Sequence, residues 1–486
     1  MTIFIDHTIQ STTMDSQSSS IAVALSGGGH RASIFGLGVL LYLFEAKKNE
    51  SVVSISSVSG GSIVNGYIGR ECDFRSGNNT EFINATKYLW DRLTSKGILF
   101  APVTTRLYLF FTVLLLLFTV FSPVVWILIT LANDLFGVSI LSGYLKAVFL
   151  FVPLLLLIPL TIAFSIRGKI CRNSFAQTLF CDKDGKESSL KSLSHKDINH
   201  IICATELHAG EHIYFSGNFV YSYRFGLGSV ECMSIAEAVQ ASTAYAPLLP
   251  PIWKNNLPFN FNGGAFSKLP SKMLLTDGGA YNNMGEQWSM GLHARKKRSS
   301  ELSKLTFDAD EVFLVNATAS VEHTPLRWFD KIPFWGEVTI CYRILCTLFD
   351  QTTSQRRKML FTEFRDALLN GGGTRGIMIM LEQTPFTMID WILTTAESRF
   401  REARDRASEV LSQMPSYTRS QWEVIKKNNI NAPTTLCAIK KRIANELVYH
   451  SFVVTMVNAH ILFGYPFFAH LLDKQNFEAQ IIQKYL

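Results

Sequence analysis

The sequence has little charge and no repeated unit, and both deficits restrict the class of protein that it encodes. Asp, Glu, Lys and Arg make up 17% of the 486 residues, below the roughly 25% of an average soluble domain. Apolar residues reach 48%, so the chain buries a large core and is not disordered throughout. The 31 glycines and 15 prolines follow no period, which excludes collagen-like and solenoid architectures.

Cysteine motifs and a secretory leader are also missing. The eight cysteines include no CxxC pair, and a chain of this length does not need disulfide bonds to fold. We therefore expect reduced, mostly buried thiols. Residues 1–20 are rich in Ser and Thr and lack the basic start and apolar segment of a signal peptide. We expect them to form a disordered tail in the cytoplasm.

The charge balance is mildly basic, with 46 Lys and Arg residues against 39 Asp and Glu residues and a net charge of +7. Such a surface suits a partner that carries phosphate, for example a membrane or a nucleic acid. No dense basic helix or finger motif is present, so no nucleic acid partner is expected. The basic run at 295–298 ends a predicted helix, where it forms either a solvated face or a contact for anionic lipid.

Two long uncharged runs are present, at 107–131 and 147–166, with 25 and 20 residues. A membrane-spanning helix needs about 20 apolar residues, so both runs qualify. Two buried core helices are one alternative. A re-entrant hairpin is the other, because Pro123, Pro153 and Pro159 can kink the helices. We expect a hairpin of two transmembrane helices over 107–166.

The charges that flank these runs predict their orientation. Basic residues lie outside both runs: Arg106, Arg167, Lys169 and Arg172. The connecting loop holds one acidic and one basic residue, Asp134 and Lys146. Because cytoplasmic flanks carry the excess of Lys and Arg, both outer flanks and both termini are expected in the cytoplasm. The segments before and after the hairpin then share one side and can build one domain.

The rest of the chain alternates strands, glycine turns and helices, which is typical of an α/β fold with a mostly parallel central sheet. The predicted strands are 21–25, 52–58, 198–205, 272–276, 311–317 and 375–381. A strand hairpin is expected around Gly210, and Ser234 with Glu237 forms a capping box that opens a helix. Residues 173–196 are polar and read as a loop. The predicted helices of the C-terminal third are 337–370, 396–413 and 437–463.

Three glycine-containing motifs follow predicted strands. They are Ser-Gly-Gly-Gly-His-Arg-Ala at 26–32, Ser-Val-Ser-Gly-Gly-Ser at 57–62 and Asp-Gly-Gly at 277–279. Ligands of open α/β sheets bind at the carboxyl ends of the strands, where all three motifs would meet. The sequence therefore predicts one site built from all three.

The residue types in these motifs are those of acyl transfer. A serine on a tight strand-to-helix turn needs small neighbours, which Gly60 and Gly61 provide, so Ser59 is the candidate nucleophile. The backbone amides of the loop at 27–29 can point at an oxyanion, and Arg31 would add positive potential or hold that loop in place. Asp277 is the candidate general base.

The order GGGxR, SxSGG, DGG resembles the patatin-like phospholipases, over about residues 20–285 apart from the hairpin. Lesser matches support it: Ala241 to Ala244 with Pro247 to Pro251, and Asn282 with Asn283. The resemblance implies a three-layer α/β sandwich and a lipid acyl hydrolase with a Ser–Asp dyad, without histidine, metal or cofactor.

Carried over by position, the resemblance makes Ser59 the nucleophile and Asp277 the base. It assigns the oxyanion hole to Gly27, Gly28, Gly29, Arg31 and Gly60. The chain departs from the pattern of the family at two positions, where Ser57 and Ala32 stand in place of glycines. Both side chains are small, so both turns stay feasible with reduced turnover.

The resemblance and the uncharged runs together divide the chain into five parts. These are a tail at 1–20, a first catalytic part at 21–100, the transmembrane hairpin at 107–166, a second catalytic part at 173–330 and a mostly helical region at 331–486.

Other motifs are weaker. The glycine loop at 27–32 also fits a dinucleotide fingerprint, but no acidic residue ends the next strand. His208, Glu211 and His212 match an inverted zinc-protease motif, which the predicted hairpin at Gly210 contradicts. His30 is expected to be structural, and nothing places His323 near the dyad.

The expected protein is therefore a membrane-anchored serine esterase that releases fatty acid from a membrane phospholipid or another acyl-lipid. The alternatives are an inactive, lipid-binding scaffold, a neutral-lipid lipase or an acyltransferase. A transporter subunit is not favoured, since the spans hold no acid or base. The oligomeric state is open.

Overall fold

The fold centres on one mixed sheet. The computed structural model describes residues 19–486 except 77, 137–142, 246–248, 320–334, 396 and 415–417. The strands of the described part are β1 (Ile21–Leu25), β2 (Val52–Val58), β3 (Asn199–Glu206), β4 (Glu211–Ser216), β5 (Val220–Ser222), β6 (Gly226–Gly228), β7 (Ile252–Asn255), β8 (Asn262–Gly263), β9 (Lys272–Asp277), β10 (Glu311–Asn316) and β11 (Arg375–Met380). The tail predicted at 1–20 and the loop between the two uncharged runs lie largely outside the described residues.

The sheet has a parallel half and an antiparallel half. The order β11-β10-β1-β2-β3 is parallel throughout. From β3 the sheet continues as antiparallel strands in the order β4-β5-β6-β8, while β9 pairs with both β3 and β7. The sheet is thus parallel where the first two glycine motifs occur, and the antiparallel strand β9 brings the Asp-Gly-Gly motif beside the end of β3.

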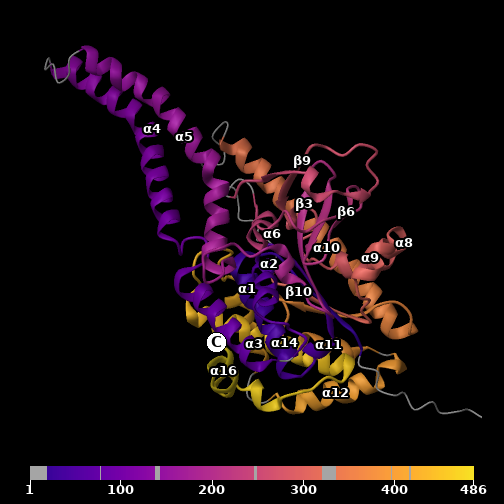
Figure 1. Ribbon diagram of the computed structural model, residues 1–486. Helices are drawn as coiled ribbons and strands as arrows, with labels where there is room; N and C mark the ends of the chain where they lie inside the picture. The colour runs from indigo at the N-terminus through magenta and orange to yellow at the C-terminus, as the bar shows by residue number, and fades with distance from the viewer. Residues whose placement is uncertain are drawn as a thin grey trace, which may run out of the picture.

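Helices cover both faces of the sheet (Figure 1). They are α1 (Gly29–Glu45), α2 (Gly60–Glu71), α3 (Asn79–Asp91), α4 (Val103–Phe136), α5 (Gly143–Phe175), α6 (Ile235–Ser242), α7 (Gln287–Met290), α8 (Leu292–Arg298), α9 (Ser300–Leu305), α10 (Trp335–Asn370), α11 (Pro385–Thr394), α12 (Arg401–Ser412), α13 (Arg419–Ile430), α14 (Lys441–Phe463), α15 (Lys474–Phe477) and α16 (Gln483–Tyr485).

The alternation of side chains along the strands separates two cores. On β10, Phe313 and Val315 join the large core with α1, α2, α6 and α14. Val312 and Leu314 point to the other face, where they pack with Phe364 of α10. Since successive side chains of a strand alternate between faces, a strand buried on both sides lies between two helical layers. The architecture is a three-layer α/β sandwich.

The helices α4 and α5 project from the body as a long antiparallel hairpin (Figure 1). The Tyr108 hydroxyl of α4 donates to the Ala163 carbonyl of α5 at 2.8 Å, and Thr105 bonds Ser174 at 3.3 Å. The most apolar window of α4 is 6% buried, and that of α5 is 0% buried. These two helices are therefore not core helices, which removes one alternative for the uncharged runs.

A third helix, α14, is also long and apolar enough to cross a membrane. Its apolar window is 78% buried, because it packs along α1 and against β11. Val453, Val454 and Val457 on this helix have no exposed surface. The apolar side chains of α14 therefore belong to the core of the protein, as expected for a helix of the C-terminal region.

Several predictions of local structure need correction. Residues 173–196 do not begin as a loop, because α5 continues to Phe175 and a π-helical turn follows over Ala176–Phe180. Phe175 and Phe180 are fully buried, so this segment anchors the base of the hairpin in the core. The cysteines are all free, as expected, but only Cys72, Cys171 and Cys203 are buried. The prediction of mostly buried thiols is wrong.

The contrast between the buried helix α14 and the surface of α13 yields a stability prediction. Val454→Asp places a charge inside the core, where an unpaired ion costs several kcal/mol. Val424→Asp changes a side chain of α13 that is 58% exposed and should shift the free energy of unfolding by less than about 0.5 kcal/mol. Urea denaturation of the detergent-solubilised protein checks both, and equal losses for the two variants would contradict the fold described.

Candidate active site

Ser59 lies on a strained turn between β2 and α2. Its φ of 49° and ψ of −117° place a non-glycine residue in a region that costs of order 1–3 kcal/mol. Ser59 occupies the N-cap position of α2, and its side chain makes no capping hydrogen bond to that helix. The residue is partly exposed, whereas its neighbours Val58 and Gly60 are buried. The turn thus presents one hydroxyl at the carboxyl edge of the sheet, as expected of a nucleophile elbow.

The glycine loop at 27–29 touches this turn directly. A Cβ on Gly60 would lie 2.0 Å from the Gly29 carbonyl oxygen, and a Cβ on Gly27 would lie 3.1 Å from the Cβ of Ser59. Only glycine fits at position 60, because the opposing atom belongs to the backbone. The three-glycine loop and the nucleophile turn are therefore in van der Waals contact.

The amides of this loop differ in their availability. The Gly27 N–H donates to the Asn283 carbonyl at 2.9 Å, so this amide is not free to bind an oxyanion. Within the described part of the chain, no acceptor is recorded for the amides of Gly28, Gly29 and Gly60. Gly28 and Gly29 have φ values of 133° and 59°, which turn their amides out of a normal helical start. These three amides are the remaining candidate donors.

Asp277 completes the constellation from the end of β9. Its Oδ1 accepts a hydrogen bond from the Gly279 N–H at 2.7 Å. The residue is 5% exposed. Burial raises the pKa of Asp277 to about 6, and the polar groups of Ser59 and Gly279 beside the carboxylate keep it from rising further. The group is a carboxylate at neutral pH with an affinity for a proton above that of an ordinary Asp.

The C-terminal region holds the glycine loop from outside. The Arg31 guanidinium donates to the carbonyls of Ile430 and Ala432 at 3.1 and 3.0 Å. His30 bonds the Cys437 carbonyl through Nδ1 at 2.7 Å, and burial lowers the pKa of His30 to about 4, so its ring is neutral. Of the two roles considered for Arg31, the structure therefore favours fixing the loop over binding an anion.

Ser57 stands where the resemblance leads one to expect a glycine. Its hydroxyl donates to the Ile201 carbonyl at 3.0 Å and accepts from Ser62 and from the Asn65 amide at 3.1 and 2.8 Å. The Asn65 side chain also bonds His200 at 2.8 Å. A buried polar network thus absorbs the extra hydroxyl behind the elbow, and the departure does not block the site.

The carboxyl-terminal end of α6 contacts the backbones of both Ser59 and Asp277. Ser242, its last residue, accepts the Ser59 N–H at 2.9 Å and donates to the Cys203 carbonyl at 2.6 Å. Two residues on, the Ala244 carbonyl accepts the Asp277 N–H at 3.1 Å. The C-terminal end of α6 therefore determines where the backbones of Ser59 and Asp277 lie relative to each other.

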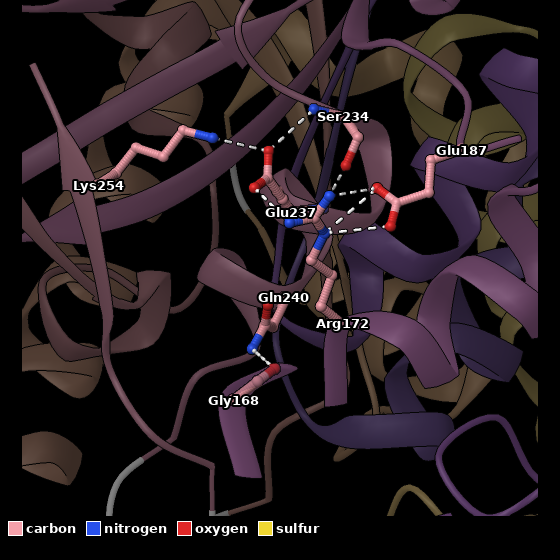
Figure 2. A network of polar contacts seen from close by, with 7 residues as sticks. All are labelled: Gly168, Arg172, Glu187, Ser234, Glu237, Gln240 and Lys254. Atoms are coloured by element: carbon pink, nitrogen blue, oxygen red, sulfur yellow. Dashed lines mark hydrogen bonds and ion pairs between the residues drawn. The ribbon is translucent and has the colours of Figure 1, made fainter. Parts of the chain in front are cut away.

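The helix α6 is also bound to the base of the hairpin. Figure 2 shows this network, made by Gly168, Arg172, Glu187, Ser234, Glu237, Gln240 and Lys254. Arg172 of α5 pairs with Glu187 at 3.0 Å and with Glu237 of α6 at 3.1 Å, and Lys254 pairs with Glu237 at 2.8 Å. Gln240 donates to the Gly168 carbonyl at 2.8 Å. One short helix thus connects the base of the hairpin to the site.

The residues of the rejected zinc motif have separate partners. The β3–β4 hairpin places Gly210 at its turn, as predicted. His208 bonds Glu206, Glu211 accepts from Ser222, and His212 donates through Nε2 to the Gly278 carbonyl at 2.9 Å. In the part of the chain that the structure describes, no group of His, Cys, Asp and Glu side chains is arranged to hold a metal ion.

Two further expectations have an outcome here. His323 lies outside the described residues. In the basic run at 295–298, Arg295 donates to the Trp288 carbonyl at 2.8 Å and Lys296 pairs with Asp308 at 2.7 Å. Lys297 and Arg298 are exposed, so contact of this run with anionic lipid stays a prediction.

Sequence reasoning missed three supports of the site: Ser242, the Ala244 carbonyl and the segment at 430–437. A Cβ on Gly29 would lie 2.5 Å from the Thr435 carbonyl oxygen, which shows how closely that segment approaches. Ser242 lies in the Ala-Ser-Thr-Ala match, so its position pointed to a role. The segment at 430–437 gives no such signal, because it acts through backbone carbonyls that any residue supplies.

Comparison with known proteins adds little. No model of a protein family matches the chain, and no curated protein matches it. Among solved structures, the crystal structure of VipD from Legionella pneumophila is similar over 96% of this chain and 92% of that chain, with 13% sequence identity and a TM-score of 0.28. A similarity at this level transfers neither a fold nor an activity.

The contacts of Ser242 lead to a prediction. Ser242→Ala leaves the buried Ser59 amide without its acceptor and should lower the free energy of unfolding by about 1–3 kcal/mol. The adjacent Thr243 is the matched control, because its hydroxyl bonds only the Val239 and Gln240 carbonyls of its own helix. Thr243→Ala should cost less than half as much in the same urea titration. The reverse order would show that Ser242 does not support the turn.

Proposed function

We propose that the protein is a membrane-anchored serine esterase that hydrolyses the carboxylic ester bond of a membrane lipid through a Ser59–Asp277 dyad. One observation carries the proposal: a serine on a strained strand-to-helix turn lies beside a buried aspartate, whose pKa it lowers, and its turn touches a glycine loop with unused amides. A nucleophile, a base and oxyanion donors are the three requirements of acyl transfer. The resemblance of the three motifs to the patatin-like phospholipases supports the same assignment.

In the first half of the reaction, the Ser59 oxygen attacks the ester carbonyl carbon while its proton passes to the Asp277 carboxylate. The carbonyl oxygen becomes an oxyanion that the amides of Gly28, Gly29 and Gly60 stabilise. Collapse of this intermediate breaks the ester bond, and the protonated Asp277 gives its proton to the departing lipid alcohol. The acyl group stays on Ser59 as an ester.

In the second half, water attacks the acyl carbon while Asp277 takes one of its protons. The oxyanion forms again at the same amides, the bond to Ser59 breaks, and the Ser59 oxygen recovers the proton from Asp277. A fatty acid leaves. A raised pKa suits a group that accepts and returns a proton in each half, because proton transfer is most efficient when the pKa lies near the working pH.

The hairpin is the proposed membrane anchor. Its two helices carry windows with mean hydropathy of 2.5 and 1.8 that the rest of the protein leaves uncovered. An isolated exposed surface of this size is unstable in water but stable in lipid. With Arg106, Arg167 and Lys169 at the body end of the hairpin, the catalytic domain and both termini lie on the cytoplasmic side.

The dyad is tested by labelling the membrane-embedded protein with a fluorophosphonate, which reacts with activated serines. We expect labelling of the wild type and complete loss with Ser59→Ala, because the nucleophile is absent. Asp277→Asn should lower labelling at least about 100-fold, since a neutral amide accepts no proton. Fatty acid release is measured on the same samples, and membrane insertion by carbonate extraction should be unchanged. Retained hydrolysis by Ser59→Ala would falsify the assignment.

The pKa of Asp277 predicts the dependence of activity on pH. The base works as a carboxylate, so kcat/KM should rise with pH and level off above an apparent pKa near 6. The buried rings of His30 and His212 have pKa values near 4, so they do not produce this limb. The measurement uses a short-chain soluble ester between pH 4 and 8. An acid limb near 4 would mean that Asp277 is not the base or is not buried.

A further inference from the structure

The amino-terminal part of α10 is an apolar helix that nothing in the described structure covers. Val338, Ile340, Tyr342, Ile344 and Leu348 are 47–59% exposed. Residues 335–349 carry only two charged side chains. We call this stretch the bare segment. Contiguous exposed apolar surface of this kind marks a site of contact with a partner or a membrane.

The carboxyl-terminal part of the same helix is firmly held. Leu360 and Phe364 are buried against β10 and β11. Arg356 forms an ion pair with the buried Glu286, and Arg357 pairs with Glu382 at 2.9 Å. The bare segment is therefore the amino-terminal part of a helix whose other end is fixed to the body of the protein. Its direction is set by that fixed half.

The bare segment lies within electrostatic range of a residue that neighbours the candidate site. Cys346 and Tyr342 both influence the charge state of Tyr245, which is 55% exposed. Asp277 influences Tyr245 as well. Tyr245 is thus near enough to feel both the bare segment and the candidate base.

The bare segment also points toward the side of the body that carries the hairpin. In Figure 1 the amino-terminal end of α10 extends from the body on the side from which α4 and α5 project, whereas α12 lies at the opposite end. The hairpin gives this side a lipid-compatible surface. A bilayer that surrounds α4 and α5 is therefore the partner nearest to the bare segment.

We propose that residues 335–349 of α10 insert into the cytoplasmic face of the bilayer beside the hairpin and form the path by which an acyl chain leaves the membrane for Ser59. The path for the acyl chain rests on the proposed function, whereas the insertion of the helix does not. At 1.5 Å per residue the bare segment is about 22 Å long, too short to span a hydrocarbon core of about 30 Å. Partial insertion of a short apolar helix is the geometry that fits.

The insertion is tested with a fluorescent probe that is attached to a native cysteine. Cys341 lies in the bare segment and is exposed. An environment-sensitive NBD group is attached to Cys341 of the full chain, with Cys346→Ser and Cys437→Ser, in phosphatidylcholine–phosphatidylglycerol vesicles. We expect blue-shifted emission and quenching by lipids that carry a doxyl group on the acyl chain.

The control moves the probe to the far end of the body. Ser408 is an exposed residue of α12, so Ser408→Cys in a chain that also carries Cys341→Ser, Cys346→Ser and Cys437→Ser places the same dye away from the hairpin. This dye should report water and escape quenching. A Cys341 probe that behaves like the control overturns the insertion. Crosslinking between the Cys341 residues of two chains, without lipid quenching, overturns it as well and assigns the bare segment to a second copy.

The path is tested by a matched pair of substitutions. Ile344→Asp puts a charge on the bare segment, and Leu411→Asp does so at an exposed apolar position of α12 that is 38% exposed. Hydrolysis of lipid in the surrounding bilayer should fall about tenfold for Ile344→Asp, since a charge in the apolar region opposes insertion. Hydrolysis of a short-chain soluble ester should stay unchanged, and Leu411→Asp should change neither rate.

The two proposals fail separately. If the Cys341 probe is quenched by lipid but no ester is hydrolysed in a Ser59-dependent way, the hydrolase assignment falls and the insertion stands. If hydrolysis depends on Ser59 while Ile344→Asp affects bilayer lipid and soluble ester equally, the esterase stands and the path is overturned.

Discussion

The backbone of Ser59 is the point on which the site depends, because its positive φ is costly and persists only while its surroundings enforce it. The enforcing contacts come from three directions. Gly29 presses against Gly60 from the glycine loop, Ser242 accepts the Ser59 amide from α6, and the hydroxyl of Ser57 secures the strand behind the turn. Together these contacts hold the turn that carries the Ser59 hydroxyl. The geometry of the candidate site is thus a property of the whole carboxyl edge of the sheet.

The C-terminal region also helps to hold the candidate site in place, because it contacts the glycine loop. Through backbone carbonyls, the residues from Ile430 to Cys437 hold Arg31 and His30, and α14 packs along α1 directly behind the glycine loop. Residues that lie more than 150 positions after Asp277 therefore hold the glycine loop. The shape of this loop depends on contacts between segments that are far apart in the sequence.

The sequence predicted the parts of the fold that repeat a local pattern. The strands from 21–25 and 52–58 through 311–317 and 375–381 lie within about a residue of their predicted bounds, and the capping box at Ser234 and Glu237 is present. The first two glycine motifs meet because β1 and β2 are parallel and end at one edge. The Asp-Gly-Gly motif does not reach that edge as predicted, on a further parallel strand, but on β9, which runs antiparallel to β3 and pairs with its end. What local patterns do not encode is tertiary packing. Residues 173–180 were predicted to be part of a polar loop. They continue the helical segment of α5 instead, because Phe175 and Phe180 are buried in the core. The hydrogen bond of the Gly27 amide and the partners of Arg31 could not be predicted either, because both involve backbone atoms that are distant in the sequence.

The continuity of α5 has a geometric consequence. The helix is continuous from its exposed apolar part to Phe175, and Arg172 and Gly168 connect its base to α6. The body of the protein is therefore joined to the hairpin through helical residues. Helical geometry then relates the two: one residue added or removed between the apolar part and Gly168 would rotate the body by about 100° and shift it by about 1.5 Å. The number of residues in that short stretch, more than their identity, decides which way the serine faces.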